Sequence, residues 1–547
     1  MRRKLLKFNG IIFFIAMIFG CESNSEIASL IPDQVSSAPN YWCTWYWQNY
    51  LINKGQDVTD PDANTIFTNE AAREGMNQES IFGEQGMAKV MLPRTRSDYY
   101  FVIDHGWQDK RIEENTFFTL QMDTLDFPRY AHLEHKEQIS QMNQDIKDLG
   151  WKGLGLWVRG NPSPEEMRKF VEWSKYAGIE YWKIDGGDID HYYATTIKND
   201  IYPQLTVEHI TGTAPINPKW DKPGLSLYPS VYNRDEAVSQ ELTASLNKAT
   251  ERLERSLDVI KNTDVFRTYD AAPLLVSTTT MQRVHDLLVQ TVGNREYRAY
   301  LNVQDDCNIA AALGLLVAVK RHPMTTPRLY KGKDFHLQIS GNRQVEKRLN
   351  EMDRFVIWQR IAPPMSSGYG SYLSSKNSLI DSIVFTESDT WYKRTHGAMV
   401  RQSAPAIMAR NISLPKVTST KLAPYVMASK FPNGAVAITT EGRVTPDKGW
   451  VHPKADIVLE NLEINKPIGI FGYYQSLTLK FSTQLPDKLV IHGQDLLANK
   501  ALVLTDKIII EKNKIIVPGN LIEKIGTMAG DPKDLSAPGM VLKVMEN

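Results

Sequence analysis

The pattern of apolar and polar residues changes period repeatedly between residues 40 and 412. Short runs rich in β-branched and aromatic residues alternate with longer stretches in which apolar residues recur every third or fourth position. This alternation of strand and helix is typical of a parallel sheet with crossover helices. The runs predict strands at 41–47, 99–104, 153–158, 181–185, 205–210, 264–269, 300–304 and 334–339.

Two of the intervening helices have clear start and stop residues. The helix predicted over 134–149 is stopped by Gly150. The next one opens with Ser163 as N-cap, Pro164 in the first turn and Glu166 to complete a capping box. Gly178 should end it. Further helices are predicted at 69–85, 235–262, 279–293 and 343–361.

Eight parallel strands are the number that closes a (β/α)8 TIM barrel. The competing fold is an open, doubly wound sheet, which usually has a glycine-rich phosphate-binding turn after its first strand. No such turn follows residues 41–47. We therefore expect a catalytic (β/α)8 barrel over residues 40–412.

The helical period stops after about residue 412. Short strand-like runs follow, separated by turn residues such as Pro432, Asn433 and Gly434. Many short strands with frequent turns predict a C-terminal antiparallel β-sandwich over residues 413–547.

The N-terminus has the features of a signal peptide, with basic residues at 2–7 and an uncharged apolar run at 11–19. The run is short for a membrane span. Residues 18–21 resemble a bacterial lipobox, although Phe19 is bulky for its position. The resemblance implies that residues 1–21 are a lipoprotein signal peptide, that Cys21 is lipidated, and that residues 22–39 are a tether. An exported cell-envelope lipoprotein is expected, at the outer membrane, the periplasmic face or the cell surface.

Composition narrows the functional classes. The 547 residues carry 63 basic and 63 acidic side chains, so nothing indicates a nucleic-acid partner. Twelve tryptophans and 23 tyrosines suit sugar faces, but cores also consume aromatics. Cys43 and Cys307 are buried free thiols or a disulfide. No spacing indicates a metal or another cofactor, and nothing indicates an oligomeric state.

The strand ending at residue 185 carries the most unusual pattern. Because side chains alternate along a strand, Tyr181, Lys183 and Asp185 share one face, while Trp182 and Ile184 form an apolar face for helices. Charges inside a sheet protein are costly unless paired, so Lys183 and Asp185 should be partners. Such a pair is either structural or holds a carboxylate ionised for chemistry.

Polar residues also follow the other strands, at the end of a barrel where active sites lie. Several carboxylates with a few cations and no metal-ligand pattern suit glycoside hydrolysis by two carboxyl groups. The strand-end residues are Trp45, Asp104, His105, Arg159, Lys183, Asp185, Glu208, His209, Arg267, Asp270, Asp305 and Asp306.

Three of these segments resemble those of glycoside hydrolase clan D, the α-galactosidase clan of families 27 and 36. Residues 102–107 resemble its Asp-Asp-Gly-Trp signature, and residues 181–185 its Lys-x-Asp nucleophile strand. Residues 266–270 resemble the segment in which an arginine shortly precedes the acid/base aspartate. The barrel-then-sandwich order also matches, so the resemblance spans residues 40–547.

The resemblance implies a retaining glycosidase with Asp185 as nucleophile and Asp270 as general acid/base. The implied substrate is a terminal α-galactose-like residue of an oligo- or polysaccharide. The remaining roles that it implies are Lys183 and Asp104 on ring hydroxyls, Glu208 and Arg267 on the 2-hydroxyl, Trp45 on a sugar face and Asp306 near the pocket.

Two departures from the family bear on specificity. The second aspartate of the strand-2 signature, which reads the 4- and 6-hydroxyls, is His105 here, and the spacing from Arg267 to Asp270 is one residue shorter than usual. A histidine suits an anionic or modified C6, with Arg159 nearby, or a sugar that lacks C6, such as arabinopyranose. Alternatively, His105 only repacks the pocket.

Two other functions fit the same scaffold. A non-catalytic sugar-binding protein would need no second carboxylate, and a transglycosylase would pass the covalent intermediate to a sugar.

Overall fold

The computed structural model describes residues 27–45, 47–48, 73–109, 119–160, 162–185, 191–210, 253–268, 276–319, 321, 329–330, 333–334, 347–384, 399–419, 421–445 and 447–546. The predicted signal peptide with Cys21, and the predicted acid/base residue Asp270, lie outside these residues. Within the described ranges no helix is long and apolar enough to cross a membrane.

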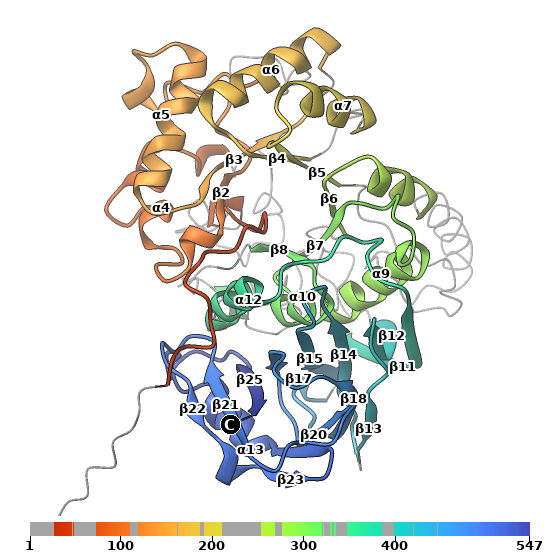
Figure 1. The fold of residues 1–547 in the computed structure, drawn as a ribbon. Helices are drawn as coiled ribbons and strands as arrows, with labels where there is room; N and C mark the ends of the chain where they lie inside the picture. The colour runs from red at the N-terminus through yellow and green to blue at the C-terminus, as the bar shows by residue number, and fades with distance from the viewer. Residues whose placement is uncertain are drawn as a thin grey trace, which may run out of the picture.

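Eight parallel strands close into a barrel in chain order, because the first strand is hydrogen-bonded to both the second and the eighth. The predicted fold class is confirmed (Figure 1). The strands are β1 (Tyr41–Cys43), β2 (Tyr100–Ile103), β3 (Gly153–Val158), β4 (Tyr181–Ile184), β5 (Thr206–Ile210), β6 (Val265–Arg267), β7 (Tyr300–Gln304) and β8 (Leu316–Val319).

Helices connect the strands, and two have the predicted boundaries. In α6 (Pro164–Ala177), the Ser163 and Glu166 side chains cap each other's backbone N–H groups, and Gly178 ends the helix at φ 65°. Only glycine adopts that left-handed conformation without strain. The other helices named here are α3 (Gln78–Phe82), α4 (Met87–Val90), α5 (His135–Asp148), α7 (His191–Ile201), α9 (Val276–Thr291), α10 (Cys307–Leu313) and α12 (Asn350–Ile361).

The two faces of β4 separate as predicted. Trp182 points outward and donates a hydrogen bond from its indole N–H to the Ser174 hydroxyl of α6 at 3.1 Å. Tyr181 points into the barrel, where its ring lies 5.2 Å from that of Tyr41 and 5.5 Å from that of Tyr100. These rings fill the barrel interior below Lys183.

The predicted position of the eighth barrel strand, residues 334–339, was wrong. Residues 333–334 belong to a separate two-stranded sheet, and the barrel is closed by β8, just after α10. All seven residues of α10 are buried, because the helix packs between the barrel and the sandwich. A helix buried all round has no amphipathic period, so α10 and β8 read as one apolar run.

Other predicted elements are shorter than expected. The strand predicted over 41–47 ends at Cys43, and a turn of helix follows that includes Trp45. In the described part of 69–85, the chain forms the short helix α3, followed by α4, instead of one long helix.

The C-terminal region is a sandwich of two sheets around its own apolar core. Its larger sheet starts before residue 413, because β11 and β12 already belong to it. Across the two sheets, three pairs of neighbouring strands are parallel and the other pairs are antiparallel. The larger sheet runs β11 (Leu373–Val384), β12 (Met399–Arg410), β14 (Tyr425–Lys430), β15 (Val436–Glu441), β19 (Ile468–Phe471), β25 (Gly539–Glu546), β21 (Leu489–Asp495) and β22 (Leu502–Val503). The smaller sheet runs β13 (Lys416–Thr418), β18 (Asp456–Leu462), β20 (Ser476–Phe481), β24 (Lys514–Pro518) and β23 (Ile509–Glu511).

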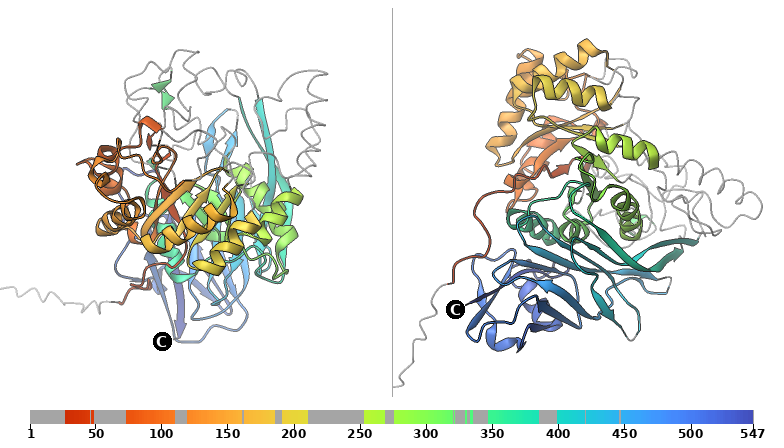
Figure 2. Two further views of the ribbon diagram at one scale, coloured as in Figure 1. Left: turned by 90° about the horizontal axis from the view of Figure 1, so that it is seen from above. Right: turned by 45° about the vertical axis from the view of Figure 1, so that its right-hand side comes forward.

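The larger sheet packs against barrel helices, as both views of Figure 2 show. Trp358 of α12 inserts its indole between Phe431 and Phe471, with ring centroids 5.9 and 6.1 Å away. Gly469 of β19 permits this approach, because a Cβ there would lie 2.9 Å from the indole. Barrel and sandwich therefore share a close-packed interface.

The described part of the predicted tether, residues 27–39, lies against the molecule. The Leu30 N–H donates to the Gln494 side chain of β21 at 2.7 Å. Farther along, the Ser36 N–H donates to Asp98 at 2.6 Å, and Lys152 donates to the backbone carbonyls of Ser37 and Ala38 at 2.9 Å. This segment crosses from the sandwich to the barrel.

Candidate active site

Four charged residues meet at the C-terminal ends of β2, β4 and β6. Lys183 forms ion pairs with Asp104 and with Asp185, the second with an Nζ–Oδ2 distance of 3.2 Å. The Nη2 atom of Arg267 lies 3.0 Å from the same Asp185 Oδ2. The predicted partnership of Lys183 and Asp185 is confirmed, and each partner has a second opposite charge beside it.

Local strand geometry places these residues. Asp104 directly follows β2, Asp185 directly follows β4, and Arg267 is the last residue of β6. The Asp185 N–H donates to the Val158 carbonyl of β3 at 3.0 Å, which continues the ladder by one residue and fixes the start of the Asp185 side chain. In a parallel barrel these positions converge at one rim.

Solvent exposure differs within the cluster: three of its side chains are buried, and one carboxylate is accessible. Asp104, Lys183 and Arg267 are buried, whereas the side chain of Asp185 is 37% exposed. Burial acts to lower the pKa of Lys183, but Asp104 outweighs it and raises that pKa above its usual value. Burial acts to raise the pKa of Asp104, but Lys183 outweighs it and lowers that pKa. Both groups are therefore charged at neutral pH, beneath a carboxylate that solvent can reach.

The oxygens of Asp104 are largely occupied by the protein. Besides Lys183, its Oδ2 accepts a hydrogen bond from the Cys43 thiol at 2.9 Å, and its Oδ1 accepts from the His105 N–H at 2.9 Å. Its own N–H donates to the Thr44 hydroxyl at 2.9 Å. These contacts favour Asp104 as the group that orients Lys183 over one that binds a sugar hydroxyl directly.

Glu208 lies on β5 beside Lys183, in register with it across the sheet. Its Oε1 accepts hydrogen bonds from Asn302 Nδ2 at 2.9 Å and from the Tyr41 hydroxyl at 3.3 Å. Its Oε2 is buried without a hydrogen-bond partner among the described residues. Burial raises the pKa of Glu208, and Arg267 only partly offsets this.

Two aromatic residues from the prediction flank the cluster. The buried His105 ring stacks on the Trp157 ring with centroids 4.7 Å apart and planes 20° apart. Trp45 is half-buried against the interior cluster that includes Tyr41, Cys43 and Tyr181. Both lie at the barrel end that carries Asp185.

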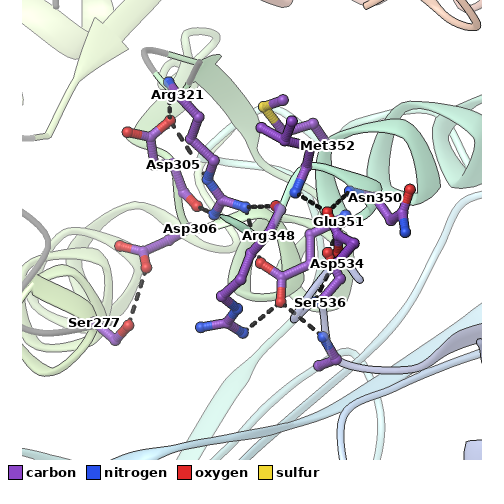
Figure 3. Close-up of polar contacts among 12 residues, drawn as sticks. Ser277, Asp305, Asp306, Arg321, Arg348, Asn350, Glu351, Met352, Asp534 and Ser536 are labelled. Carbon is purple, nitrogen blue, oxygen red and sulfur yellow. Dashed lines mark hydrogen bonds and ion pairs between the residues drawn. The ribbon is translucent and has the colours of Figure 1, made fainter. Parts of the chain in front are cut away.

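The structure does not join the other two predicted binding residues to this cluster. Arg159 follows β3 and has no hydrogen bond or ion pair to another described residue of the site. Asp306 precedes α10 and accepts a hydrogen bond from the Ser277 hydroxyl of α9 at 3.0 Å. Figure 3 shows Asp306 turned toward Ser277, while Asp305, at φ 55°, faces Arg321.

Three residues of the site were not predicted as site residues: Tyr41, Cys43 and Asn302. Asn302 had a local indication, because it is polar in the middle of an apolar strand. Tyr41 and Cys43 had none, since Tyr41 reaches Glu208 of β5 across the barrel and Cys43 reaches Asp104 through the register of β1 and β2. Of the two alternatives left open for Cys43 and Cys307, the structure has the free thiols: both are buried and unbridged.

The arrangement suits electrostatic or nucleophilic work by Asp185, with cations fixed before a substrate binds. In the described part of the chain no group of three or more histidine, cysteine or acidic side chains is placed to hold a metal ion.

No family model matches the chain, and no curated protein matches it. Among solved structures, it is similar to the catalytic domain of GH30 xylanase C from Talaromyces cellulolyticus, at 9% identity. The match covers 94% of this chain and 99% of that one, with a TM-score of 0.27. A similarity this distant adds nothing to the fold seen in the barrel itself.

Proposed function

We propose that the chain is an exported, lipid-anchored, retaining glycosidase that acts on terminal α-galactose-like residues of oligo- or polysaccharides. The observation that carries this proposal is the accessible Asp185 carboxylate, held by Lys183 at 3.2 Å and Arg267 at 3.0 Å on the barrel rim. Two buried cations stabilise the negative charge that a nucleophile needs, and they orient it without blocking solvent.

The acid/base role belongs to Asp270 in this proposal, on the strength of the resemblance in residues 266–270. Arg267, three residues earlier in the chain, ends β6 at the rim beside Asp185. Retaining enzymes hold the two carboxyl groups about 5–5.5 Å apart. Donation by Asp270 would let the leaving oxygen depart as an alcohol.

The decisive experiment combines product analysis with chemical rescue. Wild-type protein is assayed on a panel of aryl α-glycosides and candidate oligosaccharides, and Asp185→Ala is assayed with and without azide. We expect cleavage by the wild type, loss by several orders of magnitude in Asp185→Ala, and formation of the inverted glycosyl azide. Products extended by a sugar would indicate a transglycosylase, and binding without turnover would indicate a sugar-binding protein.

The leaving group tests Asp270 separately. Asp270→Ala should reduce turnover of substrates with poor leaving groups far more than that of activated aryl glycosides, because only the former need a proton. Equal losses on both would remove Asp270 from the acid role.

Specificity is proposed to favour a galactose-like sugar altered at C6: sulfated, oxidised, or lacking the carbon as in arabinopyranose. In the family, an aspartate at the position of His105 reads the 4- and 6-hydroxyls, and a site that hydrogen-bonds a hydroxyl rejects an analogue lacking it by about 10⁴-fold. With histidine there, that preference for plain galactose should be lost. Wild type and His105→Asp are compared on aryl α-galactoside and these variants. If the wild type cleaves plain α-galactoside best and His105→Asp gains nothing, His105 only fills space.

The anchoring has its own test. Mass spectrometry of the mature protein should find an acyl-modified Cys21, and Cys21→Ala should leave the membrane fraction. An unmodified Cys21 with unchanged fractionation would refute lipid anchoring and leave the glycosidase proposal intact.

A further inference from the structure

The chain enters the folded body at one edge of the sandwich. Ser29 and Leu30 both bond to the side chain of Gln494 on β21, with the Leu30 N–H at 2.7 Å and Gln494 Nε2 donating to the Ser29 hydroxyl at 2.9 Å. Only after this contact does the segment cross to the barrel, where Ser36 meets Asp98. The first fixed point after the proposed anchor is therefore on the sandwich.

The distance from that point to the anchor is short. Seven residues separate Cys21 from Ser29, where the contact with Gln494 begins. Even fully extended, this length of chain spans only about 27 Å. Lipidation at Cys21 would thus hold this edge of the sandwich, near β21 and β22, close to the lipid headgroups.

The same edge exposes several apolar side chains to solvent. Val503 of β22 is 46% exposed, and Ile509 and Ile510 of β23 are 56% and 39% exposed. β22 and β23 are the edge strands of the two sheets. Met528, 54% exposed, is next to Ala529, whose N–H donates to Asp495 of β21 at 2.9 Å.

Lysines lie among these apolar residues. Lys500, Lys507 and Lys512 are exposed, and residues 500–514 carry four lysines against two acidic residues, one of which pairs with Lys514. Figure 1 shows β22, β23 and α13 (Gly519–Gly526) on the sandwich, away from barrel helices α5 and α6. The anchor-side edge is defined here as Val503, Ile509, Ile510 and Met528 with Lys500, Lys507 and Lys512.

We infer that the anchor-side edge rests on an anionic membrane surface and orients the enzyme there, with the sandwich inward and the barrel outward. This inference rests on the proposed lipid anchoring. Apolar side chains enter the headgroup boundary while lysines bind anionic headgroups, a combination typical of interfacial surfaces. Edge-to-edge pairing with a second copy is the rival, and the charges of the lysines that flank β22 and β23 work against it.

The first experiment uses the unacylated mature chain, residues 22–547. It is sedimented with vesicles of phosphatidylglycerol and phosphatidylethanolamine, and with phosphatidylcholine vesicles. We expect binding to the anionic vesicles only, reduced at least fivefold in the double variant Ile509→Glu/Ile510→Glu. The control is Leu125→Glu, which alters a still more exposed apolar residue on the barrel (76% exposed) and should bind like wild type.

No binding, or an equal loss in Leu125→Glu, would overturn the inference. So would a dimer in vesicle-free solution that Ile509→Glu/Ile510→Glu abolishes, since the edge would then serve a second copy. Cleavage of a soluble aryl glycoside should be unchanged in every variant, so failure here is distinct from failure of the glycosidase proposal.

The second experiment measures orientation in the acylated protein. Single cysteines are introduced by Asp506→Cys at the edge and by Glu165→Cys on α6, and each is labelled with a fluorophore; Cys43 and Cys307 are buried and unreactive by comparison. A headgroup-bound quencher should reduce the emission at position 506 and leave position 165 unaffected. Equal or reversed quenching would refute the orientation, even if Cys21 is acylated.

Discussion

Two buried networks of carboxylates and cations lie at neighbouring strand ends of the barrel, and they differ in how far they are closed. The active-site cluster, Asp104, Lys183, Asp185 and Arg267, leaves one carboxylate 37% exposed. The junction network, Asp305, Arg321, Arg348 and Glu351, has every member buried. The active-site cluster therefore presents one charged side chain to solvent, whereas all the charged side chains of the junction network are shielded from it.

In the junction network, both oxygens of Glu351 accept from an arginine side chain, and one of them also accepts from a backbone N–H. Glu351 Oε2 accepts from Arg321 at 2.9 Å, while its Oε1 pairs with Arg348 and accepts from the Ala537 N–H at 3.1 Å. The Glu351 N–H donates to the Ser536 hydroxyl, so the network joins the barrel to the last segment before β25 (Figure 3). This difference in closure separates a network that fixes domains from one that is available for chemistry.

The largest effect is expected from Asp185→Asn. Turnover should fall by at least about 10³-fold, because the variant removes the nucleophile, while the melting temperature should change by only a few degrees. Kinetics on an activated aryl glycoside and thermal unfolding measure the two effects. Activity above a tenth of wild type would exclude Asp185 as nucleophile.

Glu351→Ala should instead cause a large loss of stability. It leaves Arg321 and Arg348 buried beside each other without their carboxylate, which costs about 3–5 kcal/mol of folding free energy. Denaturant unfolding measures the loss, and Glu460→Ala is the control, since it breaks exposed pairs with Lys416 and Lys480 worth about 1 kcal/mol at most. Equal losses in both variants would show that burial does not distinguish the junction.

The junction also predicts a dependence on pH. Burial acts to raise the pKa of Glu351, but Arg348 and Arg321 outweigh it and hold that pKa at about 2. A folded-state pKa below the unfolded one adds stability above about pH 4.5, and this stability is lost as the pH falls toward 2. The shift corresponds to about 3 kcal/mol.

Stability measured from pH 6 to pH 2.5 should therefore fall more steeply for wild type than for Glu351→Gln, whose amide does not titrate. Parallel curves would mean that Glu351 contributes no acid sensitivity.

Local geometry explains which parts of the site were predictable. Lys183 and Asp185 are two residues apart on one strand, so alternation alone puts them on one face. The capping box at Ser163 and the stop at Gly178 are equally local, and both were predicted correctly. Asp104 and Arg267 were placed at the rim because parallel strands end together.

What escaped prediction depends on contacts distant in sequence. The thiol of Cys43 reaches Asp104 because β1 pairs with β2 in a particular register, and Asn302 reaches Glu208 across the intervening strand β6. The misplaced eighth strand has the same cause: α10 is buried between two domains, so its sequence lacks the period that would separate it from β8.

The smallest effect on kcat/KM is expected from a comparison of two thiols, one beside each network. Cys43 donates to Asp104 Oδ2 at 2.9 Å, whereas burial raises the pKa of the Cys307 thiol, beside the junction, to about 12 and keeps it neutral. Cys43→Ala removes a donor that helps Asp104 hold Lys183, worth about 1 kcal/mol, or about a fivefold loss in kcat/KM. Cys43→Ser should recover most of this loss, since its hydroxyl also donates, and Cys307→Ala should affect stability without changing kcat/KM.

Steady-state kinetics on an aryl glycoside, with thermal unfolding for each variant, separate these outcomes. If Cys43→Ser were as impaired as Cys43→Ala, or if Cys307→Ala lost as much kcat/KM, the thiol would act only by filling space, and the hydrogen bond to Asp104 would have no part in orienting Lys183.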